Sequence, residues 1–497
     1  MKLDEFLTKT YGYNPDWKND MQSYISIWKS WYKGNVASFH NYFIYNGQKK
    51  VKQHRYTMNM AKEISEDWAD IIWSEKCEVS MKDKTSNEQY EALEDELDLN
   101  VIINQAIERA GALGTSAVVV SVGDIQTNED KTILNVDKAK TRLDVVDVDN
   151  IYPISFDNKH ISECAFGSVR YKDGKKYVIC SVHKINESTG NYEIHNHLFQ
   201  DTNGNLLEIQ QGDDTLDVFD TQSNVKWFSI FKPLITNNIF SNNPFGIPYY
   251  ANAIDNLKAV DISFDALKNE IKDGRKRTFV RSDMLNYDSG TQKMVFDPND
   301  INVYVLPNGA TKDDLIQSDT DGLRTAQQIE TLNTNLNILG SKVGFGENHY
   351  HFDGTNLSTA TAVVSSNSKL FRRKKKLEIG YESSVYDLVE GTCYASTKFG
   401  QYNINTEGMA ITFDDSIIED KEAESIRAGR EVSQGIISKV EYREKIFGET
   451  EQIATKAIQK IEEEQPNIKT LLNNEKNEKN EKNEKNEKND NSNKDEE

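Results

Sequence analysis

The sequence predicts an α+β fold, in which long amphipathic helices are separated from one another by a region of short strands. Apolar residues recur at spacings of three and four over 250–271 and over 329–343, the pattern of helices that pack along one another. By contrast, residues 115–235 alternate short β-branched and aromatic runs with Gly, Asn and Asp turns, which is typical of an antiparallel sheet. With 497 residues, the chain is long enough for two to four domains.

Residues 1–246 form the first predicted region, with a helical start and a β-rich part at 115–235. Periodicity predicts helices over Met21–Tyr32, Tyr56–Trp73 and Asn87–Leu113. Trp28, Trp31 and Tyr32 could stack on nucleic-acid bases, but few basic residues are interleaved with them, so core packing is the favoured interpretation. The predicted strands are 117–122, 142–148, 151–156, 165–171, 176–183, 192–199, 206–209 and 227–231.

One strand of this region carries His195 and His197, whose side chains share a face because strand side chains alternate. Metal sites use this spacing, but the sequence offers no third ligand nearby, so we predict neither a metal nor a cofactor. The four cysteines, Cys77, Cys164, Cys180 and Cys393, are widely spaced and are expected to be small buried thiols.

A helix is predicted over 247–274, beginning near Pro248, and a second over 323–343. Between them lies an insertion, 275–322, with strand patterns and Pro/Asn/Gly turns. The insertion opens with Arg275, Lys276 and Arg277, which are candidate basic contacts, although capping of the preceding helix dipole would also explain them.

Residues 344–356 follow the second helix and begin with Gly344-Phe345-Gly346. The segment is polar and short, so we expect an exposed loop. It presents Asn348, His349, Tyr350 and His351, the candidate residues of this loop.

The longest helical pattern lies in 357–413, a helix followed by a short strand at 410–413. About thirty helical residues would span on the order of 45 Å. Its middle carries five consecutive cations, which must spread around the helix, with Lys374 in the apolar stripe. They are either a solvated run or contacts to an acidic neighbouring subunit or nucleic acid. These candidate basic contacts are Arg372, Arg373, Lys374, Lys375 and Lys376.

The C-terminal region, 414–465, is predicted to be helical, with helices over 420–434, 439–447 and 449–465. Residues 466–497 contain a low-complexity Glu-Lys-Asn repeat and are predicted to be disordered. The repeat Glu475–Asn489 has no net charge, and the last eight residues carry −3 of the total of −21, so −18 belongs to the rest. Such acidity disfavours a protein that wraps duplex DNA, but allows DNA to pass close by.

No nucleotide-binding loop, zinc-protease or nucleophile-elbow motif occurs in the sequence, so we do not predict an enzyme. The N-terminus lacks the apolar core of a signal peptide, and no apolar run is long enough to span a membrane. The expectation is a soluble intracellular product without a membrane partner.

Four stretches carry a family resemblance: Trp28–Gly34, Met58–Lys62, Pro153–Asp157 and, above all, Thr359–Ser368. Together with the order of elements, they make the chain resemble the portal proteins of tailed bacteriophages, in the group common in long-tailed phages of Gram-positive bacteria. The family usually has an acidic residue where this chain has Ala362. The resemblance covers most of residues 20–465.

The resemblance implies a ring oligomer of about twelve copies at one capsid vertex, through which double-stranded DNA is packaged and ejected. It implies a mixed wing (1–246, with part of the long helix and its return, 357–413), a two-helix stem (247–274 and 323–343), a small α/β clip (275–322), a tunnel loop (344–356) and a helical crown (414–465). Asn348, His349, Tyr350 and His351 would face the DNA channel.

The same resemblance implies partners and a location. Terminase large subunit and a head–tail adaptor protein would meet the clip, and scaffold and major capsid protein would meet the wing. The protein would lie in the virion, and in the host cytoplasm during assembly. Two alternatives stay open: a non-portal phage scaffold or adaptor protein, and a nucleic-acid-processing enzyme without a recognisable motif.

Overall fold

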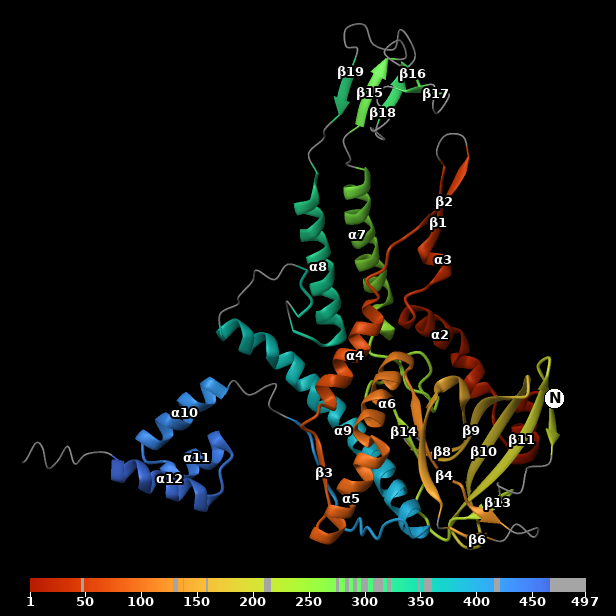
Figure 1. The fold of residues 1–497 in the computed structure, drawn as a ribbon, viewed down its shortest axis with the longest axis vertical. Coiled ribbons are helices and arrows are strands. Elements are labelled where there is room, and N and C mark those ends of the chain that lie inside the picture. The colour runs from red at the N-terminus through yellow and green to blue at the C-terminus, as the bar shows by residue number, and fades with distance from the viewer. Residues whose placement is uncertain are drawn as a thin grey trace, which may run out of the picture. The chain divides into compact units, whose positions relative to one another are not determined.

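The structure is a computed structural model, shown as a ribbon in Figure 1. Two compact units divide it, Met1–Asp414 and Asp415–Glu497, and each is described by itself. The described residues are 1–45, 49–127, 133–136, 138–157, 160–209, 216–273, 277–281, 286–288, 293–295, 303–306, 316–319, 323–346, 349–352, 360–414 and 421–464.

The helices of the first unit follow the predicted periodicity closely, with one break. The predicted helix over Asn87–Leu113 is wrong as a single element, because Asp98 takes a left-handed conformation (φ 49°) that ends one helix and begins the next. Helix α1 was not predicted. The helices are α1 (Leu3–Tyr11), α2 (Asp16–Tyr32), α3 (Ala37–His40), α4 (Met60–Ile72), α5 (Lys84–Leu97), α6 (Leu99–Leu113), α7 (Ile254–Asp273), α8 (Thr325–Val343) and α9 (Ala360–Lys398).

All eight strands predicted between 115 and 235 are present. The largest sheet has the order β12-β11-β10-β9-β8, with β13 paired to β11, and a three-stranded sheet has the order β14-β4-β7. The strands are β4 (Ser116–Gly123), β7 (Lys140–Asp147), β8 (Ile151–Asp157), β9 (His160–Lys172), β10 (Lys175–Ile185), β11 (Tyr192–Thr202), β12 (Asn205–Ile209), β13 (Val218–Asp220) and β14 (Phe228–Phe231).

Four smaller pairings join segments outside these two sheets. Strands β1 (Asn41–Tyr45) and β2 (Lys50–His54) form a hairpin, and β3 (Glu78–Ser80) pairs with β20 (Ala410–Thr412). The latter pair ties the end of the long-helix region back to the N-terminal helices. The remaining short strands are β5 (Gln126–Thr127) with β6 (Ile133–Asn135), and β16 (Asn286–Asp288) with β17 (Lys293–Val295).

One hydrophobic core joins α2, α4 and α6 to the β14-β4-β7 sheet and to α9. Trp28 and Trp31 are buried in it and Tyr32 packs against it, which confirms core packing over base stacking for this group. Helix α1 packs separately on the large sheet, where Phe6 and Leu7 contact a cluster containing Val178, Val182 and Phe199. The four cysteines are buried free thiols, as predicted.

Helices α7 and α8 pack along each other as their matching seams predict. Asn335 Nδ2 donates to Ser263 Oγ across the pair at 2.6 Å, and Arg324 forms an ion pair with Glu270 at 3.1 Å. The helix expected to begin at Pro248 begins instead at Ile254, after a 3-10 turn at Ala251–Ala253. In the chain between them, β15 (Arg277–Arg281) pairs in parallel with β18 (Val303–Leu306) and antiparallel with β19 (Ile316–Asp319).

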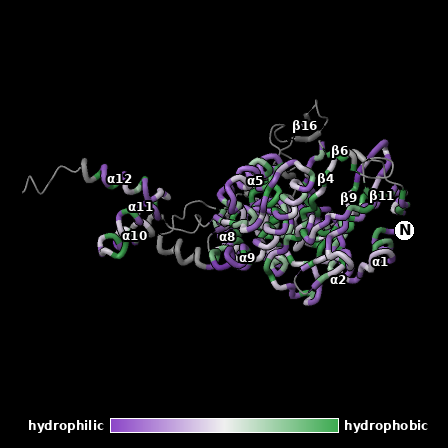
Figure 2. Tube along the Cα trace, turned by 90° about the horizontal axis from the view of Figure 1, so that it is seen from below, coloured by the Kyte–Doolittle hydropathy of each residue, from purple (hydrophilic) through white to green (hydrophobic). Residues whose placement is uncertain are grey.

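The second unit contains α10 (Lys421–Ser433), α11 (Lys439–Phe447) and α12 (Glu451–Glu464), which confirms the three predicted helices. Ser438 and Glu441 form a capping box at the start of α11. Hydrophilic and hydrophobic segments alternate along these helices (Figure 2). The tail predicted to be disordered, 466–497, lies outside the described residues.

His183 on β10 is a buried titratable group in the core. Its ring lies 5.5 Å from that of Phe166 and 5.3 Å from that of Phe228, and in the described part of the chain neither ring nitrogen has a hydrogen-bond partner. Burial lowers the pKa of His183 to about 3. The folded protein therefore keeps this imidazole neutral where the unfolded chain protonates it.

We expect His183 to make the fold acid-sensitive. Because its folded pKa lies below the unfolded value near 6.5, its stabilising contribution is complete above pH 6.5 and is lost as the pH falls toward 3. Urea unfolding at pH 7 and at pH 5 measures how much unfolding free energy each protein loses over this range. The loss should be about 2 kcal/mol smaller for His183→Leu than for the unmodified protein. The control is His54→Leu, at an exposed position on β2. Equal pH dependence of His183→Leu and the unmodified protein would contradict this.

Candidate functional site

The segment after α8 turns sharply and packs its first aromatic residue into the core. Gly344 ends α8 with φ +109°, and a Cβ there would lie 2.9 Å from Arg373 Cγ and 3.3 Å from the Trp68 ring. Only glycine combines that backbone conformation with that approach. Phe345 is fully buried, and its ring stacks on Trp68 with centroids 4.6 Å apart.

The candidate loop residues continue this aromatic stack. The His349 ring lies parallel to Phe345 at 4.2 Å, and the Tyr350 hydroxyl donates to Asp67 Oδ2 on α4 at 2.6 Å. Burial, and then the Asp67 carboxylate, raise the pKa of Tyr350 well above its usual value, so the hydroxyl stays a donor. These bonds attach the segment to α4.

The prediction of an exposed loop is therefore wrong for Tyr350 and His351, which are half-buried, but it holds for His349 and Phe352, which are exposed. The polar composition of the segment led to the wrong prediction, because the side chains of Phe345 and Tyr350 contact α4, a helix distant in sequence. His349 still exposes 31% of its side chain. Asn348 lies outside the described residues, and the channel role of the loop stays a prediction.

The five cations of α9 spread around the helix as predicted, but Lys374 is neither solvated nor available to a partner subunit. Its side chain is fully buried, with Nζ 2.6 Å from Glu378 Oε1 and donating to the carbonyl oxygen of Asp414. Glu378, also buried, has its other oxygen 3.2 Å from Lys375 Nζ. Lys374 is thus an internal ion-pair residue, and both predicted interpretations are wrong for it.

Three of the other four cations contribute to a basic groove between α8 and α9, of about 920 Å³. The described residues that line it include no carboxylate. Lys369 Nζ donates to the carbonyl oxygen of Ser341 at 2.6 Å, near the negative end of the α8 dipole. Burial lowers the pKa of Arg373. The lining residues are Asn337, Ile338, Ser341, Lys342, Gly344, Lys369, Arg372, Arg373 and Lys376.

This groove can hold anionic groups, either phosphates or carboxylates, because charged donors converge on it from two helices. It contains three residues of the predicted basic run, Arg372, Arg373 and Lys376. Lys342 and Lys369 were missed, because no spacing within one helix reveals which cations a second helix brings alongside. Of the other candidates, Arg275 and Lys276 lie outside the described residues, and Arg277 begins β15.

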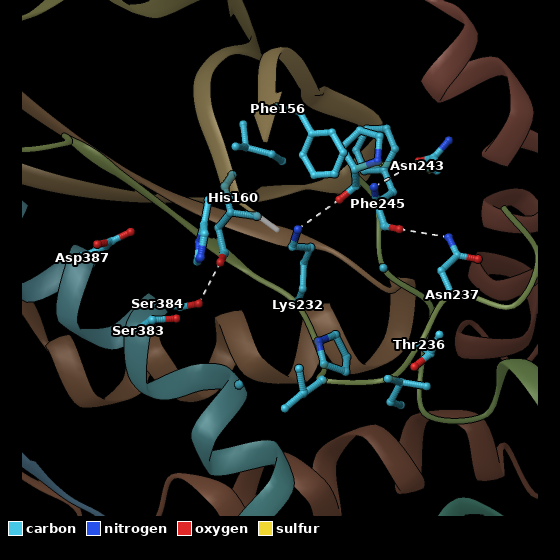
Figure 3. Close-up of a pocket in the computed structure, with 18 of the residues that line it drawn as sticks. Phe156, His160, Lys232, Thr236, Asn237, Asn243, Phe245, Ser383, Ser384 and Asp387 are labelled. Atoms are coloured by element: carbon cyan, nitrogen blue, oxygen red, sulfur yellow. Dashed lines mark hydrogen bonds between the residues drawn. The ribbon is translucent and has the colours of Figure 1, made fainter. Parts of the chain in front are cut away.

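A second hollow, of about 570 Å³, lies between β14, the loop after it and α9, and shares Lys376 with the basic groove. Lys232 reaches into it and donates to the carbonyl oxygen of Pro244 at 3.1 Å (Figure 3). Burial lowers the pKa of Lys232 to about 8. Asp387 at its rim forms an ion pair with Lys226 at 3.0 Å, so the carboxylate is matched internally.

His195 and His197 lie on one face of β11, as predicted, but Tyr11 holds them together. Its hydroxyl lies 3.1 Å from His195 Nδ1 and 2.6 Å from His197 Nε2. Glu193 and Glu208 bond the remaining ring nitrogens at 3.2 and 2.8 Å. Among the described residues no cluster of three or more His, Cys, Asp or Glu is arranged to hold a metal ion.

The described residues thus combine two helices packed along each other, α7 and α8, with a basic groove between α8 and α9. A family model described as "Phage portal protein, SPP1 Gp6-like" matches residues 14–471, nearly the whole chain. The class is therefore that of phage portal proteins. Within it, the chain belongs to the SPP1 Gp6-like family.

Other comparisons add little. Two solved structures are similar: the neck of a native GTA particle computed with C12 symmetry, and the neck of an empty GTA particle computed with C6 symmetry. The first has a TM-score of 0.33 and 9% identity and covers 77% of this chain and 88% of that chain. The second has a TM-score of 0.32 and 10% identity, with 78% and 88% covered. Among curated proteins, none matches the chain. In the described part of the chain, no helix is both long and apolar enough to cross a membrane.

We expect the buried ion pair of α9 to be sensitive to the loss of one partner. Lys374→Met should lower the unfolding free energy by about 3 kcal/mol, because it leaves the buried Glu378 carboxylate with only one lysine. Adding Glu378→Leu should recover most of this loss. Chemical denaturation measures both.

Lys375→Met is the matched control, since that side chain is 40% exposed and its loss should cost less than about 1 kcal/mol. The assignment of Lys374 as an internal ion-pair residue would be wrong if both single variants were equally stable.

Proposed function

We propose that this portal protein assembles into a ring of about twelve copies at one vertex of a phage head, and that double-stranded DNA passes through the ring. The observation that carries the proposal is the match of the portal family model to residues 14–471. The paired helices α7 and α8, which bracket a small separate sheet, agree with the element order expected of a portal stem and clip.

The proposed parts follow the expected ranges. The wing comprises 1–246 with part of 357–413, the stem 247–274 and 323–343, and the clip 275–322. The tunnel loop is 344–356 and the crown 414–465. Two contacts support a rigid joint between the tunnel loop and the wing, namely the Phe345 stack on Trp68 and the Tyr350–Asp67 bond. The Asn335–Ser263 bond supports the pairing of the two stem helices.

An acidic protein suits a channel for DNA, because it repels phosphate and lets a duplex slide without settling into a bound state. The chain carries −21 at pH 7. Within the tunnel loop, His349 is the described candidate with its ring partly exposed and its plane fixed by Phe345. Tyr350 acts mainly as an anchor, because contact between its hydroxyl and DNA would compete with Asp67.

The proposed partners follow from the same ring. The clip would meet terminase large subunit and the head–tail adaptor protein, and the wing would meet scaffold and major capsid protein. The basic groove, with Arg372, Arg373 and Lys376, would contact phosphate groups or an acidic neighbouring surface. Assembly would take place in the host cytoplasm, before the ring becomes part of the virion.

We expect electron microscopy of the purified full-length protein, classified by rotational symmetry, to show rings of about twelve subunits with a central channel. If the protein is monomeric alone, co-expression with the scaffold and capsid proteins of its phage should yield the same rings. A compact small oligomer without a channel under both conditions would exclude the proposal and favour a non-portal adaptor.

The histidines of the tunnel loop should affect DNA handling rather than folding. We expect phage carrying His349→Ala with His351→Ala to retain less DNA per head, because the loop loses its partly exposed imidazole and its stack on Phe345. The measurement is packaged DNA per capsid, with His160→Ala, an exposed residue of β9, as control. Normal packaging and retention of DNA in this variant would show that both histidines have only a structural role in the loop.

A further inference from the structure

The hairpin β1–β2 has two chemically different faces. In its antiparallel register Phe43 lies opposite Lys52 and Tyr45 opposite Lys50, while Ile44 lies opposite Val51. Because opposite residues share a face and neighbours alternate, Phe43, Tyr45, Lys50 and Lys52 lie on one side. We call this side the arm face.

The arm face is open in the single chain. Phe43 and Tyr45 are 65% and 66% exposed, and Lys50 and Lys52 are also exposed. On the opposite face Val51 and Gln53 are partly covered. The two largely exposed aromatic side chains lie close together on this face, and Tyr and Phe are enriched where proteins associate.

The base of the hairpin is fixed to α7 by two buried carboxylates. Asp261 accepts hydrogen bonds from the Met58 backbone N–H at 2.9 Å and from His40 Nε2 at 3.1 Å. The Val36 backbone N–H donates to His40 Nδ1 at 2.9 Å, which places the ring proton on Nε2. Asp265 accepts from the Tyr56 backbone N–H at 3.2 Å. The base is therefore held, although a two-stranded hairpin alone is marginally stable.

The charge of this region contrasts with that of the chain. From Met21 to Lys62 the sequence contains no Asp or Glu, although the whole chain has 80. The same stretch contains seven lysine and arginine residues, including both lysines of the arm face. The arm face is therefore complementary in charge to the acidic surfaces that the rest of the chain provides.

We propose that the arm face packs against a carboxylate-bearing surface of a second copy of this chain. The inference rests on the proposed ring, in which each head-to-tail contact joins two different surfaces of the same protein. Phe43 and Tyr45 supply the apolar anchor of the contact, and Lys50 and Lys52 supply charge matching. Nucleic acid is the weaker candidate, since two lysines on the face would neutralise only about two phosphates.

The first test replaces the aromatic anchor. Phe43→Ser with Tyr45→Ser should lower the ring fraction in size-exclusion light scattering about tenfold at equal protein concentration. Lys50→Glu with Lys52→Glu should do the same and add repulsion. The matched controls, Tyr171→Ser with Leu207→Ser and Lys172→Glu with Lys175→Glu, change equally exposed residues on other hairpins and should assemble normally. Circular dichroism confirms folding of each variant.

The second test identifies the partner. Rings assembled from equal amounts of unlabelled and ¹⁵N-labelled protein are treated with a carbodiimide, which joins a lysine amine to a contacting carboxylate as an amide. We expect peptides in which Lys50 or Lys52 of one label is linked to an Asp or Glu of the other. Links found only within one label would overturn the proposal. Arm variants that form normal rings would also overturn it, whether or not those variants lose DNA binding.

The outcomes separate this inference from the proposed function. If the unmodified protein and the arm variants all formed normal rings, the proposed portal ring would be supported and the proposed arm contact would be excluded. If the unmodified protein formed no ring, the proposed ring would fail, and mixed-label links in any smaller assembly would decide the arm contact by themselves.

Discussion

The close approach of α9 to the segment that contains β14 is the constraint on which the first unit depends. A Cβ on Gly391 would lie 2.3 Å from the Lys226 carbonyl oxygen, and a Cβ on Gly380 2.7 Å from Leu234 Cβ. Eleven residues separate these glycines, so they lie within about 20° of each other on one helix face. Between them, Ser229 and Ser384 donate hydroxyl hydrogen bonds across the gap, to the Ser384 and Ile230 carbonyl oxygens at 2.6 and 2.8 Å. Helix and strand are thereby locked in register.

These contacts between α9 and the β14 segment determine the position of the rest of α9. Beyond Gly380 toward its N-terminus the helix leaves β14, and its inward positions must find other partners. Arg373 lies beside Gly344, and Lys374 is satisfied by Glu378 and the Asp414 carbonyl oxygen. A buried ion pair contributes little net stability compared with apolar packing, but it tolerates few alternative arrangements. Lys374 also donates to the carbonyl oxygen of Asp414, the last residue of the first unit, and so holds the chain where it leaves that unit.

Sequence reasoning succeeded where a feature is periodic and local, and failed where it depends on distant partners. The helices α7, α8 and α9 and the eight strands β4, β7 to β12 and β14 follow from apolar spacing and turns. The break at Asp98 was missed because both flanking helices keep a continuous apolar pattern. The hairpin β1–β2 was missed although Asn46-Gly47 is a strong hairpin signal. Two other features depend on helices that only the fold brings together. One is the burial of Phe345 and Tyr350 against α4, and the other is the contribution of Lys342 and Lys369 to the groove.

The uneven distribution of charge bears on the symmetry of the proposed assembly. Identical copies that carry −21 repel one another, and a two-fold contact would place a basic patch against itself. A head-to-tail contact avoids this, because the basic surface of one copy meets an acidic surface of the next. At the groove between α8 and α9 and on the arm face, the described residues include several cations and no carboxylate. If neighbouring copies cover such surfaces, the area left for DNA is more acidic than the average of the chain, and assembly itself would make the channel less adhesive to phosphate.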